Sequence, residues 1–328
     1  MEEVKVNEIS TGFDNLEPVN NFVELSSEER TSVWDRFTGV GYDYAGLMNI
    51  ILLIGIFMLA KYIFKSFVMS KKRVGKWQGQ NFSYAVSSFS FFISLAFILS
   101  SVGYGDVTTS WLEGATKTIT YTGLGIALLI LTGLIFDKLV INRYSLNKQI
   151  AEGNIAAGIF DAGNFFSAAL IISSALMWQE IKELQAIFAV LGIYAVSQLI
   201  LVVATHVRAY FFNNARTKTN FQEEIRNGNT AVAIDFAGRR VGTALAITAA
   251  TKLLSYQNSF DFTEVVLEWV GVSIILLVIL NSVSWVISKV LFWNRDLYQD
   301  VLDRNNASAL SNVAIYISLG VIIANGFY

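Results

Sequence analysis

The fold of this chain is decided by the stretch Gly228-Asn229-Thr230-Ala231-Val232-Ala233-Ile234-Asp235-Phe236-Ala237-Gly238-Arg239-Arg240-Val241-Gly242. It opens an apolar run that continues to Ala250, with an acid and two bases inside it. A soluble helix could carry these charges on a solvent-exposed face. In a membrane span the charges must be paired or must line a water-filled cavity. The surroundings of this stretch therefore determine how its charges are interpreted.

The same stretch recurs along the chain at residues 153–163, 305–309 and, more weakly, 80–85. The leading asparagines, Asn81, Asn154, Asn229 and Asn306, are 73, 75 and 77 residues apart. Each begins an apolar run that follows a basic joint. The predicted unit is therefore a helical hairpin, and four such units point the same way as parallel repeats.

Composition places the chain in a membrane. Of its 328 residues, 54% are hydrophobic and 15% are charged, whereas a soluble domain has about 25% charged residues. There is no cysteine, and His206 is the single histidine. The sequence has no phosphate loop, metal-ligand pair or nucleophile elbow. We therefore expect no enzyme activity, no cofactor and no metal. The scattered basic residues also indicate no nucleic-acid partner.

Eight continuous apolar runs are long enough to cross a bilayer as helices, which need about 20 residues each. We expect an all-α integral membrane protein with an acidic tail (1–43), a first four-span domain (44–178) and a second one (179–328). Tryptophans near the span ends fit an interfacial belt. The expected spans are 44–67, 81–102, 115–137, 154–177, 185–209, 229–251, 265–288 and 306–327, and the belt residues are Trp77, Trp111, Trp178, Trp269 and Trp293.

The distribution of Lys and Arg predicts the orientation. Fifteen basic residues lie in the four joints that precede the Asn-led helices, and six lie on the opposite side. The positive-inside rule places the basic joints in the cytoplasm and both termini outside. The tail holds ten acidic and three basic residues. It is either a short interfacial helix with Trp34 and Phe37 toward the headgroups or a disordered segment.

Each Asn-led helix has two different faces at about 100° per residue. Nine and thirteen residues after the Asn, three units carry small residues that allow close helix packing. The fourth unit departs from this pattern, because it has Ile315 and Leu319 at the two positions. The small residues Ala314 and Ser318 lie one residue earlier. The three small pairs are Ser90 with Ser94, Gly163 with Ser167, and Gly238 with Gly242.

The intramembrane charges are Asp161, Asp235, Arg239 and Arg240. We expect Asp235 to pair with Arg239 one turn on, and Asp161 to pair with Arg240 between adjacent repeats. These residues form either a neutral structural cluster or part of an ion pathway. The four asparagines either hydrogen-bond across helices or line an entrance.

One further stretch, Ser101-Val102-Gly103-Tyr104-Gly105-Asp106, nearly spells the potassium-channel filter. A filter needs four copies, each after a short re-entrant helix. The other three units lack the motif, and the preceding run is long enough to cross. We interpret the stretch as an outer Gly-rich turn, and only four identical chains around one axis would restore the filter.

The pattern Gly-Asn-x-Ala-x-x-(x)-x-Asp-(x)-Ala-Gly on an outward helix resembles the YjfL-type family of bacterial inner-membrane proteins, built on a domain of unknown function with four spans. The match is best over 148–176 and 223–250. The first and last hairpins lack the Asp and Gly. The resemblance implies two such domains in tandem, a bacterial inner membrane and a link to envelope-stress proteins of the phage-shock type. It implies no catalytic residues.

We therefore expect a non-enzymatic membrane component that supports envelope integrity through partners. Its partners would be the lipid bilayer, together with further copies of the chain or envelope-stress membrane proteins. The alternative is a channel or transporter for a small cation or a proton that uses the even-numbered helices.

Overall fold

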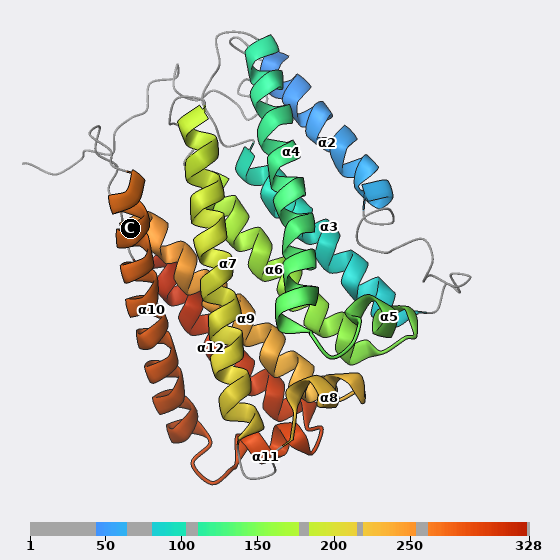
Figure 1. Cartoon of the computed structure of the whole chain (residues 1–328), viewed down its shortest axis with the longest axis vertical. Coiled ribbons are helices and arrows are strands. Elements are labelled where there is room, and N and C mark those ends of the chain that lie inside the picture. Colours follow the sequence, from blue (N-terminus) through green and yellow to red (C-terminus); the bar gives the residue numbers. More distant parts are fainter. Residues whose placement is uncertain are drawn as a thin grey trace, which may run out of the picture.

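The computed structural model describes residues 44–63, 81–102, 111–176, 184–214, 219–253 and 262–326, and within these ranges it is all helical. The long helices alternate in direction along the molecule (Figure 1). They are α2 (Tyr44–Ile63), α3 (Phe82–Val102), α4 (Trp111–Ile135), α6 (Ile155–Leu176), α7 (Leu184–Asn213), α9 (Thr230–Leu253), α10 (Phe262–Leu291) and α12 (Asn306–Asn325). A π-helical turn, η2 (Phe136–Val140), extends α4.

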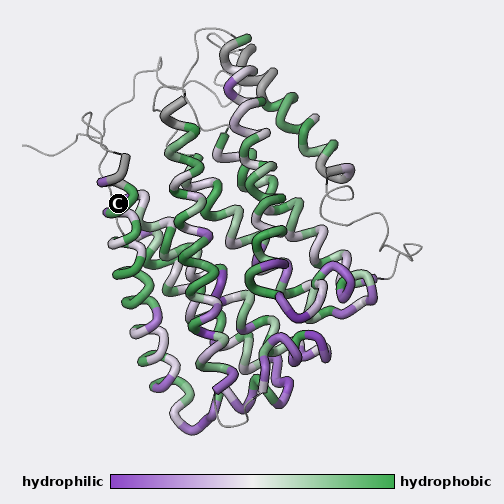
Figure 2. The backbone as a smooth tube through the Cα atoms, viewed as in Figure 1, coloured by the Kyte–Doolittle hydropathy of each residue, from purple (hydrophilic) through white to green (hydrophobic). Residues whose placement is uncertain are grey.

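Three short helices lie together at one end of the molecule, where hydrophilic residues gather (Figure 2). They are α5 (Leu146–Ala151), α8 (Phe221–Arg226) and α11 (Leu297–Leu302), and each precedes one of the Asn-led helices. Six described helices are long and apolar enough to cross a membrane: α3, α4 with η2, α6, α7, α10 and α12. The chain is therefore a multi-pass membrane protein. The other two expected spans correspond to α2 and the charged α9, so the count of eight stays a prediction.

The Asn-led helices form a continuous inner row, in which α3 packs on α6, α6 on α9, and α9 on α12. The preceding helices lie outside this row: α4 against α6 and α2, and α10 against α9 and α12. The expected domain boundary after residue 178 falls between α6 and α7. The packing of α6 on α9 continues across it in the same way as the packing within each half.

The turn before each Asn-led helix explains why the repeats begin where they do. Gly153, Gly228 and Arg304 have left-handed φ values of 88°, 80° and 61°. Each follows a short helix, and the next residue donates its N–H back to that helix, as in a Schellman motif. In the fourth repeat this next residue is Asn305, which caps α12. The sequence-based choice of Asn306 as the repeat asparagine was therefore wrong by one residue.

The corrected register restores the small face of α12. Counted from Asn305, the ninth and thirteenth positions are Ala314 and Ser318, rather than Ile315 and Leu319.

The glycines of the small face lie where neighbouring helices meet. An added Cβ at Gly163 would lie 2.5 Å from the Cβ of Ala237 on the next helix. Added Cβ atoms at Gly238 and Gly242 would likewise meet Val313 and Tyr316 on α12. These glycines therefore set the distance between α6, α9 and α12.

The serines of the small face are also buried, but their hydroxyl groups do not bond to a neighbouring helix in the described part of the chain. Ser90, Ser94 and Ser167 are each 0% exposed. Ser90 Oγ donates to the Ser87 carbonyl at 2.7 Å, and Ser167 Oγ donates to the Asn164 carbonyl at 2.9 Å, both within one helix. Ser94 Oγ is buried without a hydrogen-bond partner among the described residues. A packing role for Ser94 and Ser167 therefore depends on their small size alone and stays a prediction.

The structure corrects one aromatic assignment and leaves others open. Trp269 is only 1% exposed and lies in the apolar core, so its place in an interfacial belt was wrong. Trp293 is 81% exposed. The tail with Trp34 and Phe37, the filter-like residues 103–106, and two further belt residues (77 and 178) lie outside the described residues.

Candidate functional site

The repeat asparagines connect one repeat to the next at the hydrophilic end. In all four repeats the side-chain Oδ1 accepts the N–H three residues on, which caps the helix. In three of them the side-chain amide also donates to the last two carbonyls of the next repeat's short helix. These bonds run from Asn81 to Ile150 and Ala151, from Asn154 to Ile225 and Arg226, and from Asn229 to Val301 and Leu302.

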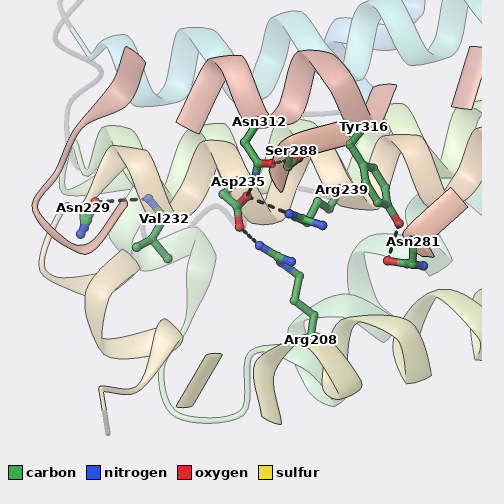
Figure 3. A network of polar contacts seen from close by, with 9 residues as sticks. All are labelled: Arg208, Asn229, Val232, Asp235, Arg239, Asn281, Ser288, Asn312 and Tyr316. Carbon is green, nitrogen blue, oxygen red and sulfur yellow. Dashed lines mark hydrogen bonds and ion pairs between the residues drawn. The ribbon is translucent and has the colours of Figure 1, made fainter. Parts of the chain in front are cut away.

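Asp235 is the centre of a polar network between α7, α9 and α12 (Figure 3). Its Oδ1 accepts from Arg239 Nε at 3.2 Å and from Asn312 Nδ2 at 3.0 Å. Its Oδ2 accepts from Arg208 Nη2. The carboxylate is almost fully buried, whereas the two arginine side chains are partly exposed. The expected Asp235–Arg239 contact is present, and Arg208 and Asn312 are additional partners.

The network continues into α10. Ser288 Oγ donates to Asn312 Oδ1 at 3.2 Å, and Tyr316 Oη donates to Asn281 Oδ1 at 3.2 Å. The Arg239 guanidinium lies over the Tyr316 ring, 5.0 Å from its centroid, within cation–π range. The outer helix α10 is thereby connected to the inner row through neutral polar side chains.

Asp161 and Arg240 do not meet, so the expected pair between them was wrong. Asp161 accepts a hydrogen bond from Ser87 on α3. Arg240 donates from Nη1 to Thr205 on α7 at 3.0 Å and lies over the Phe136 ring. Both side chains are buried. The reason is geometric, because α9 turns Arg240 toward α7 and η2, whereas α6 turns Asp161 toward α3.

The same interface position recurs between successive repeats. The sixth residue after the asparagine of one repeat contacts the seventh residue after the asparagine of the next repeat. The pairs are Ser87 with Asp161, Phe160 with Phe236 as rings 6.4 Å apart, and Asp235 with Asn312. This contact is therefore polar at the α3–α6 and α9–α12 interfaces, where it contains the two buried carboxylates. At the middle interface, between α6 and α9, it is aromatic.

A cavity of about 440 Å³ opens beside the Asp235 network. Its inner end is lined by Asp235, Arg208 and Arg239, and its outer end by Lys289 and the turn before α11. Within the described ranges, no three His, Asp or Glu side chains come together in a way that could hold a metal ion.

Sequence reasoning missed Arg208 and Asn312. Arg208 was assigned to a basic joint, although α7 extends to Asn213 and keeps it within the helix. Asn312 lies seven residues after Asn305, as Asp161 does after Asn154, so the correct register would have identified it. His206 is an exposed residue whose Nε2 lies 3.0 Å from the Leu139 carbonyl.

Comparisons with known proteins were made against this geometry. The family described as Domain of Unknown Function (DUF350) matches residues 37–176, 108–219 and 182–327. A UPF0719 transmembrane protein of Aquifex aeolicus (strain VF5) is 24% identical over 277 residues, which are 82% of this chain and 98% of that protein. No solved structure matches.

Proposed function

Because this chain belongs to the family described as Domain of Unknown Function (DUF350), its function must be argued from its own residues, and we propose that it is a non-enzymatic multi-pass protein that supports envelope integrity through membrane partners. The link to the envelope rests on the resemblance to YjfL-type proteins. The same resemblance supports a bacterial inner membrane as its location.

The observation that carries this proposal is the closed packing of the inner row. Gly163 approaches Ala237 so closely that a methyl group would not fit between α6 and α9. The Phe160, Phe221 and Phe236 rings fill the space beside them. The Asp235 carboxylate is bound by three side chains. These contacts favour a structural role for the charges over an ion pathway along the Asn-led helices.

The proposed architecture is eight spans in four parallel hairpins, with the basic joints in the cytoplasm and two four-span domains in tandem. The three ranges matched by the family begin 71 and 74 residues apart, which is close to the spacing of the asparagines. Successive matched ranges thus start one hairpin apart, which supports the hairpin as the repeating unit. The position of α5, α8 and α11 at one end supports one polar face for all the basic joints.

Flux through purified protein in liposomes tests the proposal. We expect K⁺, Na⁺ and H⁺ to leak at the rate of protein-free vesicles under an applied potential, with gramicidin as the positive control. A saturable flux that Asp235→Asn abolishes would contradict the proposal. Dye entry into a deletion strain under osmotic shock tests the envelope role, and wild-type protein should restore the barrier.

The alternative, a proton or cation pathway, is favoured by one observation. Asp161 is buried, and within the described residues it has a hydroxyl partner, Ser87, but no ion pair. A carboxyl group held in this way can exchange a proton. In the same liposomes this alternative predicts a proton flux that Asp161→Asn removes and that Glu223→Gln, at the exposed surface, leaves unchanged.

A further inference from the structure

The inner end of the cavity carries an excess positive charge. Arg208 and Arg239 both contact Asp235, so two guanidinium groups share one carboxylate. The remaining partner of that carboxylate, Asn312, is neutral. Arginine stays protonated in proteins, and an unbalanced charge at membrane depth is costly. The cavity therefore has room for an anion at the place where one negative charge is missing.

One nitrogen atom at this place has no acceptor. Nε of Arg208 is buried and has no hydrogen-bond partner among the described residues. Buried polar groups in proteins are nearly always hydrogen-bonded. The Arg208 side chain as a whole is partly exposed and lines the cavity, so Nε would gain an acceptor if the side chain moved toward the oxygen of a bound ligand.

The outer end of the cavity is also basic. Lys289 and Arg295 line it, and within the part of the chain that the structure describes neither forms an ion pair. The one acidic side chain there, Asp296, accepts the N–H groups of Tyr298 and Gln299 and so caps α11. The cavity lining therefore carries four basic and two acidic side chains, an excess of two positive charges.

We propose that this cavity binds a phosphate group, with Arg208 and Arg239 at its inner end and Lys289 and Arg295 at its mouth. Guanidinium groups bind phosphate oxygens through short, charge-assisted hydrogen bonds. The phosphate belongs to an anionic phospholipid or is free in solution, and the experiment below distinguishes the two. This inference goes beyond the proposed function, which stands or falls separately with the flux assay.

The outer wall of the cavity favours the lipid. α10 forms this wall, and its other face is exposed and apolar, with Val286 at 50% and Val290 at 71% exposure. In a bilayer the acyl chains would lie along this face, while the headgroup enters from the side. Basic pockets between membrane helices at the cytoplasmic surface are known to hold anionic headgroups.

Binding can be measured by native mass spectrometry of delipidated protein with added phosphatidylglycerol, and with phosphatidylcholine as the uncharged comparison. We expect retention of phosphatidylglycerol alone. Lys289→Gln and Arg295→Gln should each weaken it about tenfold, the effect of losing one hydrogen bond to a charged group. Both residues lie outside the Asp235 network, so folding should be unaffected. The control is Lys138→Gln, at an exposed position of η2.

Inorganic phosphate, titrated calorimetrically into the same protein, provides the second arm. If phosphate does not bind or compete, the ligand is the lipid; if it binds and displaces the lipid, the site recognises phosphate itself. Equal retention of phosphatidylglycerol and phosphatidylcholine would overturn the proposal. So would an unchanged affinity in Lys289→Gln, Arg295→Gln and Arg239→Gln, because the bound lipid would then lie elsewhere.

Discussion

Asp235 shows how much of this molecule depends on a single carboxylate. Asp235→Asn leaves Arg208 and Arg239, which are only partly exposed, without their counter-charge, and removing one partner of a buried pair costs about 3–5 kcal/mol. Thermal unfolding in detergent should show a loss of this order. Glu223→Gln is the matched control, because its pair with Arg143 is exposed and such pairs contribute about 0–1 kcal/mol. Equal effects in both variants would contradict the network.

Gly228 has a conformational role that can be separated from packing. Its φ is +80°, and an added Cβ would meet no atom within 4 Å. Gly228→Ala should therefore destabilise by about 1–2 kcal/mol through backbone strain alone. Gly271, inside α10, also has open space around it, and Gly271→Ala should stabilise by about 0.5–1 kcal/mol. Denaturant unfolding would show these opposite signs, and a loss in both would refute the conformational explanation.

At the residue scale, the sequence reveals contacts within a helix better than contacts between helices. The Asp235–Arg239 contact follows from four-residue spacing on one helix. The partners of Asp161 and Arg240 depend on how α6 and α9 are rotated against their neighbours. Composition does not determine that rotation. An error of one residue in the fourth repeat was enough to hide Asn312.

Among the elements, the small face of α9 should be the most sensitive to enlargement. A side chain at Gly238 would overlap Val313 on α12, whereas Gly271 on the outer helix meets nothing within 4 Å. We expect Gly238→Leu to destabilise by at least about 1–3 kcal/mol, as overpacking does, and Gly271→Leu to have little effect. The midpoint of thermal unfolding in detergent measures both. Similar small shifts would show that α9 and α12 can separate without loss.

The asparagine contacts provide a comparison between repeats. Asn229→Ala removes a helix cap, worth about 1 kcal/mol, and also two bonds to carbonyls at the end of α11. Asn305→Ala removes the cap, and no acceptor for the Asn305 amide is found in the described ranges. Asn229→Ala should therefore cost more, by about 1–3 kcal/mol. Equal losses in chemical unfolding would mean that the inter-repeat bonds contribute nothing.

The sequence was a good guide to the long helices and a poor one to the short ones. Runs of about 20 apolar residues have few alternatives to a spanning helix. By contrast, α5, α8 and α11 have six residues each and lie in polar joints, where no apolar run indicates them. Their caps are visible in the sequence only as scattered Ser, Asn and Asp residues. The left-handed turn at Arg304 was hidden because most such positions carry glycine.

For the whole molecule, orientation is the property that can be checked most directly. The basic joints predict that the end with α5, α8 and α11 is cytoplasmic. A cysteine replacing Leu112, which is exposed and lies before the expected span at the opposite end, should react with an impermeant maleimide in intact spheroplasts. A cysteine replacing the exposed Lys148 should react only after the cells are opened. The reverse labelling pattern would invert the proposed topology.

The asparagine contacts run in one direction along the chain, and this matters during synthesis. Asn81, Asn154 and Asn229 each donate to a short helix about 70 residues further on, which leaves the ribosome later. A newly inserted hairpin therefore lacks these carbonyl partners until its successor is made, and chains fold from the N-terminus during synthesis. A chain stopped after α6 would keep the bond from the Asn154 amide to Gln149 Oε1 but would lack the two bonds to the end of α8. We therefore expect the row to assemble in the order of synthesis, with each hairpin completed by the one that follows it.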